Sequence, residues 1–263
     1  MRREDRERRK RTFNEAAEKY QRTRPPYPDE VFGRLFELAP IGPDSRVLEI
    51  GAASGRASVS IAASGCELIC LEPGPDLAAL AANNLRPFPK AKVEVAEFES
   101  YEPAGAFDAI VAASSWHWID PETRYAKAAR ALVPGGSLCL ITSEHAYPED
   151  FDPFFAEVQR CYEGIGWKLE TFPPPIPDLP DEYPEFEASR FFGAPAVSKI
   201  VWSREFQSQE YIDLLDTYSD HRLLEPPAKT WLFECIRRLI ATRPGRRVIK
   251  HFLTFVVVAR RSG

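Results

Sequence analysis

The chain lacks any long apolar run. None of its apolar stretches approaches the ~20 residues that a membrane-spanning helix requires, so we expect no membrane partner. The first eleven residues also lack the apolar core of a secretory signal. Their basic side chains are interleaved with Glu4, Asp5 and Glu7, which predicts a solvated or frayed helix. Contact of this segment with RNA or a membrane surface stays open as an alternative.

Cysteine and histidine are sparse, and neither shows the spacing of a metal site. The four histidines form no ligand pattern, and no two cysteines make a CxxC pair, so the sequence indicates no zinc site and requires no metal. We expect buried free thiols in a reducing compartment, and hence a cytoplasmic protein. The cysteines are Cys66, Cys70, Cys139, Cys161 and Cys235.

The composition indicates one large domain with an elaboration. The chain has 263 residues, of which 44% are hydrophobic, and this is enough for a full core. Its net charge is -5 with 28% charged residues, so the surface as a whole does not predict a polyanion partner. We therefore expect no nucleic acid among its partners.

A β-α-β pattern opens the domain at Arg46-Val-Leu-Glu-Ile-Gly-Ala-Ala-Ser-Gly-Arg56. An apolar strand ends at Gly51, a second glycine follows at Gly55, and a helix is expected to Gly65. A second strand, residues 66–71, ends on the acid Glu72. In open parallel sheets such glycines let the backbone approach a ligand, and an acid at this place can accept hydrogen bonds from ribose hydroxyls.

Strands and helices continue to alternate, which predicts a doubly wound, mostly parallel sheet. Further strands are expected around Val93 and Val95 and over residues 107–112 and 137–142. Helices are expected over 28–39, 76–85 and 120–132, the last starting at the capping dipeptide Asp120-Pro121.

The rhythm changes after Thr142. Helices are expected over 151–163, 208–220 and 226–242, and residues 172–184 hold six prolines, which predicts an extended loop. Strands over 197–206 and 251–259 complete the sheet as an antiparallel pair. The added helices and the loop are expected to cover the carboxyl edge of the first five strands, where open α/β sheets bind ligands.

Five motifs occur in a fixed order along residues 13–142. They are Phe13-Asn-Glu-Ala-Ala-Glu-Lys-Tyr20 with Arg24-Pro-Pro-Tyr-Pro28, the glycine loop, Glu72, Ser114-Ser-Trp-His-Trp118 and Leu132-Val-Pro-Gly-Gly136. Together they resemble class I S-adenosylmethionine (SAM) methyltransferases, and in particular the small-molecule, trans-aconitate methyltransferase-like group. One position departs from the family, which usually has a third glycine where this chain has Ala53.

The resemblance implies a Rossmann-like core and a cofactor site. The implied core is residues 28–143 and 191–263, the segment 1–27 folds over the cofactor, and 144–190 and 207–245 form a substrate cap. The cofactor is SAM, with S-adenosylhomocysteine (SAH) as product. The implied cofactor-binding residues are Tyr20, Arg24, Glu49, Gly51, Ala52, Gly55, Glu72, Pro73, Glu97, Phe98, Ala113 and Trp116.

The roles within this set follow the parts of SAM. By family position Glu49 lies near the methionine ammonium, Glu72 near the ribose hydroxyls and Glu97 near the adenine amino group. A capping role for Glu49 and a core role for Phe98 remain alternatives. Tyr20 and Arg24 are suited to the methionine carboxylate, because guanidinium pairs with it in bidentate fashion.

The turn after the fourth strand carries the candidate catalytic residue, His117. It can act as a proton acceptor, or it can pack and hydrogen-bond only, since methyl transfer often succeeds by alignment. The indole of Trp116 can favour the sulfonium by cation–π attraction, and Trp118 is expected to anchor the following helix. The candidate substrate residues are Trp116, His117, His145, Tyr147, Tyr218 and His221.

The expected activity is methyl transfer from SAM to a small-molecule acceptor, at a carboxylate or hydroxyl oxygen, by in-line displacement. One alternative is a methyltransferase-fold protein that binds SAM but catalyses another reaction, such as a cyclisation. Another is an RNA or protein methyltransferase. A monomer or a homodimer is expected.

Overall fold

The computed structural model describes residue 14 and residues 17–167 and 183–262. Its centre is a seven-stranded sheet in the order β3-β2-β1-β4-β5-β7-β6. The strands are β1 Arg46–Ile50, β2 Glu67–Leu71, β3 Ala91–Glu94, β4 Phe107–Ala113, β5 Leu132–Ala146, β6 Ala196–Gln207 and β7 Arg247–Arg260. The first five are parallel, and β7 runs antiparallel to both of its neighbours, which confirms the predicted fold class.

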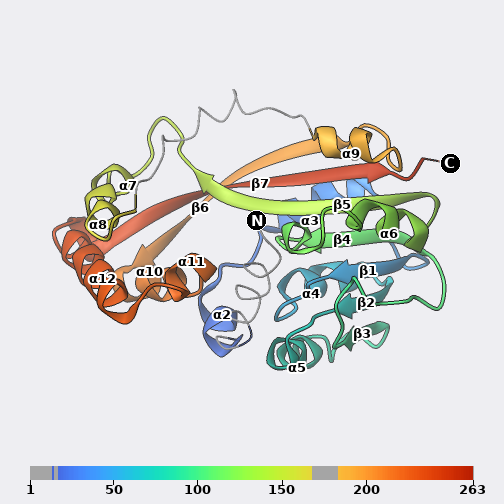
Figure 1. Ribbon diagram of the computed structural model, residues 1–263, viewed down its shortest axis with the longest axis horizontal. Helices are drawn as coiled ribbons and strands as arrows, with labels where there is room; N and C mark the ends of the chain where they lie inside the picture. The colour runs from blue at the N-terminus through green and yellow to red at the C-terminus, as the bar shows by residue number, and fades with distance from the viewer. Residues whose placement is uncertain (1–13, 15–16, 168–182, 263) are drawn as a thin grey trace.

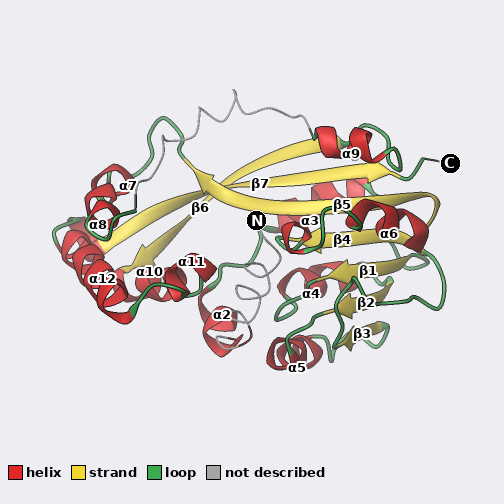
Figure 2. Cartoon of the chain, viewed as in Figure 1, coloured by secondary structure: helices red, strands yellow, loops and turns green. Residues whose placement is uncertain are grey.

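Helices cover both faces of this sheet (Figure 2). One face packs under α3 and α4 through Val31, Leu35 and Ile61, and the other under α6 and α9 through Tyr125 and Phe186. The helices and short turns of the core are α2 Ala17–Thr23, α3 Asp29–Leu38, α4 Arg56–Ala62, α5 Pro75–Asn84, η1 Trp116–Trp118, α6 Arg124–Ala131 and α9 Pro184–Ser189.

The strands β5, β6 and β7 are long and extend past β1, β2, β3 and β4. A second group of helices packs on this extension (Figure 1). It has its own apolar core, in which Phe154, Tyr211 and Ile236 are buried. Its members are α7 Phe154–Glu157, α8 Gln159–Glu163, α10 Ser208–Leu215, α11 Ser219–Arg222, α12 Pro226–Ala241 and η3 Pro244–Arg246. We call α7, α8, α10, α11 and α12 the cap.

Several predicted boundaries shift in the structure. The helix expected from Asp120 begins at Arg124, because turns fill residues 121–123 and Asp120 accepts the N–H of Glu122 at 3.0 Å. The helix expected over 151–163 divides into α7 and α8, and that over 208–220 into α10 and α11. The six-proline stretch lies almost entirely outside the described residues.

A disulfide corrects the expectation of free thiols. Cys161 of α8 and Cys235 of α12 are bonded, with a Cα–Cα distance of 5.8 Å across 74 residues of sequence. Spacing in the sequence does not reveal this pair, because only the packing of α8 on α12 brings the two positions together. Cys66, Cys70 and Cys139 are buried free thiols, as predicted. Since disulfides persist mainly in oxidising compartments, cysteine usage no longer supports a cytoplasmic location.

None of the helices in the described ranges has the length and apolar character needed to cross a membrane.

Candidate active site

Two adjoining cavities lie where the parallel strands end. The arrowheads of β1, β2 and β3 point toward α2 and the cap in Figure 1, so this is the edge at which open α/β sheets bind ligands. The first cavity has a volume of about 770 Å³ and the second about 1110 Å³, each including the part open to solvent. They share a wall made of Tyr20, Gly51, Ala53, Ala113 and Ser114.

The glycine loop after β1 is held close to its neighbours. Gly51 has φ +72°, and a Cβ there would lie 2.6 Å from the Cβ of Ser115. Gly55 has φ +83°, and a Cβ there would lie 3.1 Å from the Cα of Ala81. Both positions therefore require glycine, for backbone conformation and for space. Gly51 lines both cavities, whereas Gly55 caps α4 and lines neither.

Ala53 adopts the left-handed conformation with φ +48°, although it has a Cβ. This conformation costs an L-residue roughly 1–2 kcal/mol, a cost that a glycine at this position would not have. The backbone N–H of Ala53 donates a hydrogen bond of 2.8 Å to Oε2 of Glu72.

Glu72 ends β2 and lines the first cavity with Pro73. Its carboxylate also accepts the N–H of Gly74 at 2.8 Å. Burial raises the pKa of Glu72, while the hydrogen bonds from Gly74 and Ala53 oppose the shift. Each carboxylate oxygen keeps a lone pair after these bonds, so Glu72 can still accept from a ligand hydroxyl.

The rest of the first cavity is largely apolar. Phe98 is 3% exposed and belongs to the core, and it also lines the cavity. Its contact with adenine stays a prediction. Glu97 and Glu99 line the cavity too. Apolar side chains together with these acids and Glu72 suit a ribose joined to a purine.

The turn of η1 places its aromatic residues differently from the sequence expectation. Trp116 is 5% exposed and packs edge-on against Tyr125 at 5.3 Å, outside both cavities. Trp118, expected to be a core anchor, lines the first cavity instead. His117 is exposed, lies against the Trp118 ring at 4.6 Å and lines neither cavity. Although its side chain is exposed, partial desolvation of the ring by the surrounding protein, and then Arg124, lowers the pKa of His117.

The N-terminal segment closes the second cavity. Tyr20 lines both cavities, and Arg24 lines the second with its guanidinium 4.3 Å from the ring centre of Tyr218. Arg24 Nε donates to Thr217 Oγ1 at 2.8 Å, and its Nη2 donates to the carbonyl of Thr217 at 3.2 Å. These bonds fix the side chain that the sequence assigns to the methionine carboxylate.

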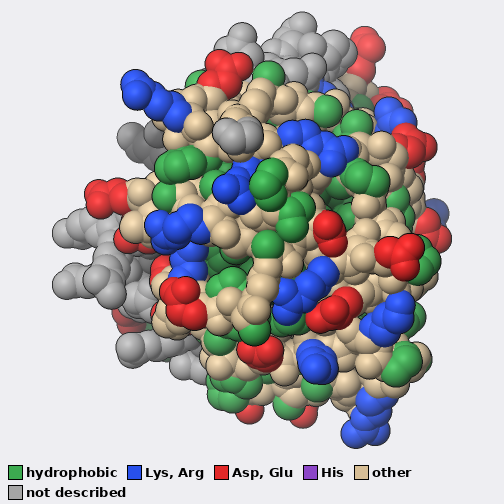
Figure 3. All heavy atoms as spheres, turned by 90° about the vertical axis from the view of Figure 1, so that its right-hand side faces the viewer, with side chains coloured by type: hydrophobic (Ala, Val, Ile, Leu, Met, Phe, Trp, Pro, Cys, Tyr) green, Lys and Arg blue, Asp and Glu red, His purple; other side chains and the backbone are tan. Residues whose placement is uncertain are grey.

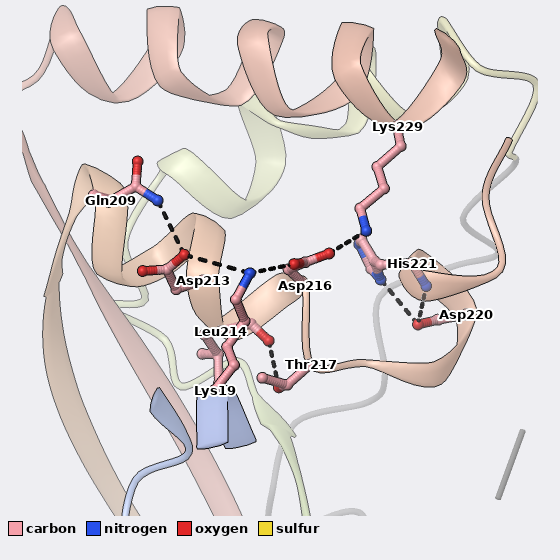
Figure 4. A network of polar contacts seen from close by, with 9 residues as sticks. All are labelled: Lys19, Gln209, Asp213, Leu214, Asp216, Thr217, Asp220, His221 and Lys229. Atoms are coloured by element: carbon pink, nitrogen blue, oxygen red, sulfur yellow. Dashed lines mark hydrogen bonds and ion pairs between the residues drawn. The ribbon is translucent and has the colours of Figure 1, made fainter. Parts of the chain in front are cut away.

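An ionic network connects the same segment to the cap (Figure 4). Lys19 of α2 lies 2.5 Å from Asp216 and 3.9 Å from Asp213, at the end of α10. Asp216 also pairs with Lys229 of α12. Burial would raise the pKa of Asp216, but the bonds from Lys19 and Lys229 hold it below its ordinary value. Helix α2 is thus docked on α10, and Asp216 also connects α10 to α12.

Glu49 is the most deeply buried acid of the site. It is 1% exposed, lines the second cavity, and accepts a long hydrogen bond of 3.4 Å from the Cys70 thiol. Burial raises the pKa of Glu49 to about 7. A cation beside this carboxyl group would favour its ionised form, which is consistent with the predicted ammonium partner. Ala52 lines the same cavity.

The candidate substrate residues divide into two groups. His145 and Tyr218 line the second cavity. Tyr147 and His221 line neither cavity. The Tyr147 hydroxyl is hydrogen-bonded to His145 Nδ1 at 2.9 Å. The His221 ring is hydrogen-bonded to Tyr162 at 3.1 Å and to Asp220 at 2.9 Å. Burial lowers the pKa of His145 to about 2, helped by Lys250, so its ring is neutral.

Three of the cavity-lining residues that the sequence did not single out as site residues are charged or aromatic and bear on the function. Arg56 and Lys250 line the second, and Trp118 the first. Arg56 directly follows the glycine loop, which is a usable signal. Lys250 shares the inward face of a late strand with Val248 and Phe252, so the alternation of that strand also marks it.

The sequence is similar to known methyltransferases. Residues 48–140 match the family described as a methyltransferase domain. An uncharacterized methyltransferase of Mycobacterium tuberculosis is 27% identical over 237 residues, which cover 89% of this chain and 87% of the relative. A relative in Mycobacterium bovis, also described as an uncharacterized methyltransferase, has the same identity and coverage.

Solved structures share the fold. A proposed type II methyltransferase from Anaeromyxobacter dehalogenans has a TM-score of 0.60 at 24% identity, covering 90% of this chain and 97% of that one. A proposed methyltransferase from Bacillus halodurans has a TM-score of 0.53 at 15% identity, covering 88% and 98%. The chain is thus similar to methyltransferases along residues 48–140 and to the two curated relatives over most of its length, and it shares its fold with methyltransferases of known structure. Its place in the trans-aconitate methyltransferase-like group stays a prediction.

Proposed function

We propose that this chain binds SAM in the first cavity and transfers its methyl group to a small-molecule acceptor in the second. The observation that carries the proposal is the shared wall at Gly51, Ala53, Ala113 and Ser114, across which the two cavities meet. If the nucleoside part of SAM lies in the first cavity, its methionine part lies at this wall. Tyr20 belongs to this wall, while Glu72 lines the first cavity and Glu49 the second, so each predicted contact faces the space that we assign to SAM.

The proposed acceptor atom is a carboxylate or hydroxyl oxygen. SAM would supply an activated methyl group: an oxygen lone pair forms the new C–O bond as the C–S bond breaks, and sulfur keeps the electron pair. A carboxylate acceptor has no proton to lose, whereas a hydroxyl acceptor would release its proton to solvent. The residues of the chain orient the two reactants and exclude water, which is the main requirement of an in-line displacement. Because His117 lies outside both cavities, we assign it packing rather than proton transfer.

The alternatives receive less support. Ala53 was the reason to consider a reaction other than methylation, yet it adopts the glycine-like conformation that the loop requires. For an RNA substrate a broad basic surface would be expected. The described part of the face in Figure 3 intersperses Lys and Arg with Asp and Glu. We therefore propose a small molecule, bound in the second cavity, as the acceptor. The cytoplasmic location stays a prediction.

The test is titration calorimetry of the purified protein with SAM and with SAH. We expect saturable heat from both ligands, and protection of residues 46–56 and Glu72 from amide exchange when SAH is bound. Absence of heat and of any thermal shift at high ligand concentration would contradict the proposal. Adenosine alone is the control, because it lacks the methionine part that reaches the second cavity.

A further inference from the structure

The second cavity is walled on one side by the extension of the sheet. Lys250 and Phe252 follow each other on the inward face of β7. In the register of β6 and β7, Lys250 lies opposite Arg204, and Phe252 opposite Trp202. The Trp202 and Phe252 rings stack at 4.3 Å. Cross-strand neighbours on one face lie side by side, so this wall combines the stacked rings of Trp202 and Phe252 with the cation of Lys250.

Lys250 is buried without an anionic partner. It is 6% exposed, and its ammonium lies 5.5 Å from the ring centre of Phe155 and 5.2 Å from that of Phe252. Within the described residues, its Nζ makes no hydrogen bond and no ion pair. A buried charge without a partner is costly, and proteins keep one mainly where a ligand completes it. Burial, and then Arg24, lowers the pKa of Lys250 to about 7.

Other cations gather around the same space. Arg24 and Arg56 line the cavity from the N-terminal segment and from α4. Arg56 Nε is buried without a hydrogen-bond partner, and its pKa is lowered by burial with Arg204 and Arg24 contributing. The acids that line the cavity are Glu49 and Glu144, of which Glu49 is buried beside the glycine loop and Glu144 is exposed. Positive charge is therefore in excess.

An anion bound by the N-terminal segment leaves the ammonium of Lys250 without a partner. The methionine carboxylate is assigned to Tyr20 and Arg24 at the end nearest the glycine loop. Lys250 belongs to β7, on the wall formed by the sheet extension. The cations that line the cavity thus come from different elements, and the buried ammonium of Lys250 is suited to a second anion.

We propose that the methyl acceptor carries an anionic oxygen group, a carboxylate or a phosphate, on an apolar or aromatic body, and that Lys250 binds this group. Trp202, Phe252 and Tyr218 supply the apolar surface on which the body of the acceptor lies. The inference rests on the proposed function, because it assigns the acceptor to the second cavity. It assigns the anchoring group of the acceptor and leaves the methylated oxygen to be found.

The experiment uses the SAH-loaded protein and three probes of similar shape: benzoate, phenyl phosphate and uncharged benzyl alcohol. Binding is measured by ligand-observed NMR and calorimetry for the wild type and for Lys250→Met, Lys250→Arg and Lys199→Met. Met keeps the length and apolar character of the lysine stem without its charge. Lys199, also on the sheet but outside both cavities, is the matched control.

We expect at least one anionic probe to bind the wild type about tenfold or more tightly than benzyl alcohol, because a hydrogen bond to a charged group is involved. Lys250→Met should abolish this preference, while Lys250→Arg and Lys199→Met keep it. SAH affinity should be the same in all four proteins. Tighter binding of benzoate identifies a carboxylate, and tighter binding of phenyl phosphate identifies a phosphate.

Two results would overturn the inference: anion binding that survives Lys250→Met, or a loss of SAH affinity in Lys250→Met, which would assign Lys250 to the methionine carboxylate. Failure of the wild type to bind SAH is a separate outcome that overturns the proposed function itself. Thermal unfolding of each variant shows that it is folded, and a buried Met in place of an unpaired ammonium should not destabilise the protein.

Discussion

The backbone N–H of Ala53 donates a hydrogen bond of 2.8 Å to the carboxylate of Glu72, across the ends of β1 and β2. The same carboxylate accepts the N–H of Gly74 at 2.8 Å, so one acid holds the glycine loop and the turn after β2 together. The acid predicted to bind ribose therefore also shapes the wall of the cavity. Its two duties can be separated by a variant that keeps its size.

Glu72→Gln should weaken SAH binding by about 1.5–3 kcal/mol, because a charged acceptor is lost and one backbone N–H faces an amide donor. Calorimetry with SAH measures the change. Glu67→Gln is the matched control, since Glu67 begins the same strand at the opposite edge and is exposed. An equal dissociation constant for Glu72→Gln and wild type would contradict a ligand contact of Glu72.

Ala53→Gly should raise the free energy of unfolding by about 0.5–1 kcal/mol. The gain comes from relief of the left-handed Cβ, partly offset by the greater freedom of glycine in the unfolded chain. Ala52→Gly is the control, because Ala52 is not among the residues with positive φ and should lose stability on substitution. Chemical denaturation compares the variants, and destabilisation by Ala53→Gly would show that the methyl group packs favourably.

Local sequence signals were sufficient to predict the loop. The residues of β1, the glycines and Glu72 lie within one β-α-β unit, where backbone chemistry decides the conformation. The orientation of η1 was not predictable in this way. Trp116 and Trp118 are two residues apart, and only the packing of Trp116 on Tyr125 decides which indole reaches the cavity.

Long-range packing also decides the features of the cap. The bond between Cys161 and Cys235 joins helices 74 residues apart in the sequence. Lys250 lies just before the predicted strand 251–259, and only the tertiary structure shows that it is buried and lines the second cavity. Such pairings depend on tertiary contacts that a single sequence does not encode locally.

The buried carboxyl group of Glu49 should make stability depend on pH. Burial raises its pKa from the ordinary 4.5 to about 7 in the folded state. Between these values the folded chain binds more protons than the unfolded chain, so the free energy of unfolding falls as pH rises through this window. Glu49→Gln removes the titrating group and should remove this fall, which integrates to about 3 kcal/mol.

Denaturation of wild type and Glu49→Gln at several pH values between 4.5 and 8 measures the difference. Glu94→Gln is the control, because Glu94 lies on β3 and is exposed, and its curve should parallel that of the wild type. Parallel curves for wild type and Glu49→Gln would contradict a raised pKa in the folded state.

The docking of α2 on the cap should influence cofactor binding through Tyr20, which follows Lys19 and lines both cavities. Lys19→Met removes the ion pair with Asp216, in which the two charged groups lie 2.5 Å apart. Because the pair is partly exposed to solvent, it stabilises the docked helix by only about 0.5–1 kcal/mol. We expect SAH affinity to fall by a corresponding few-fold, and amide exchange in α2 to accelerate. Because salt screens such a pair, the difference from wild type should shrink as salt approaches about 1 M.

Glu18→Gln, on an exposed position of the same helix, is the control and should leave SAH affinity unchanged. Equal SAH affinities for Lys19→Met and wild type at low salt would show that α2 closes the site without help from the cap. A difference that persists undiminished at high salt would attribute the effect to packing of the lysine stem rather than to its charge.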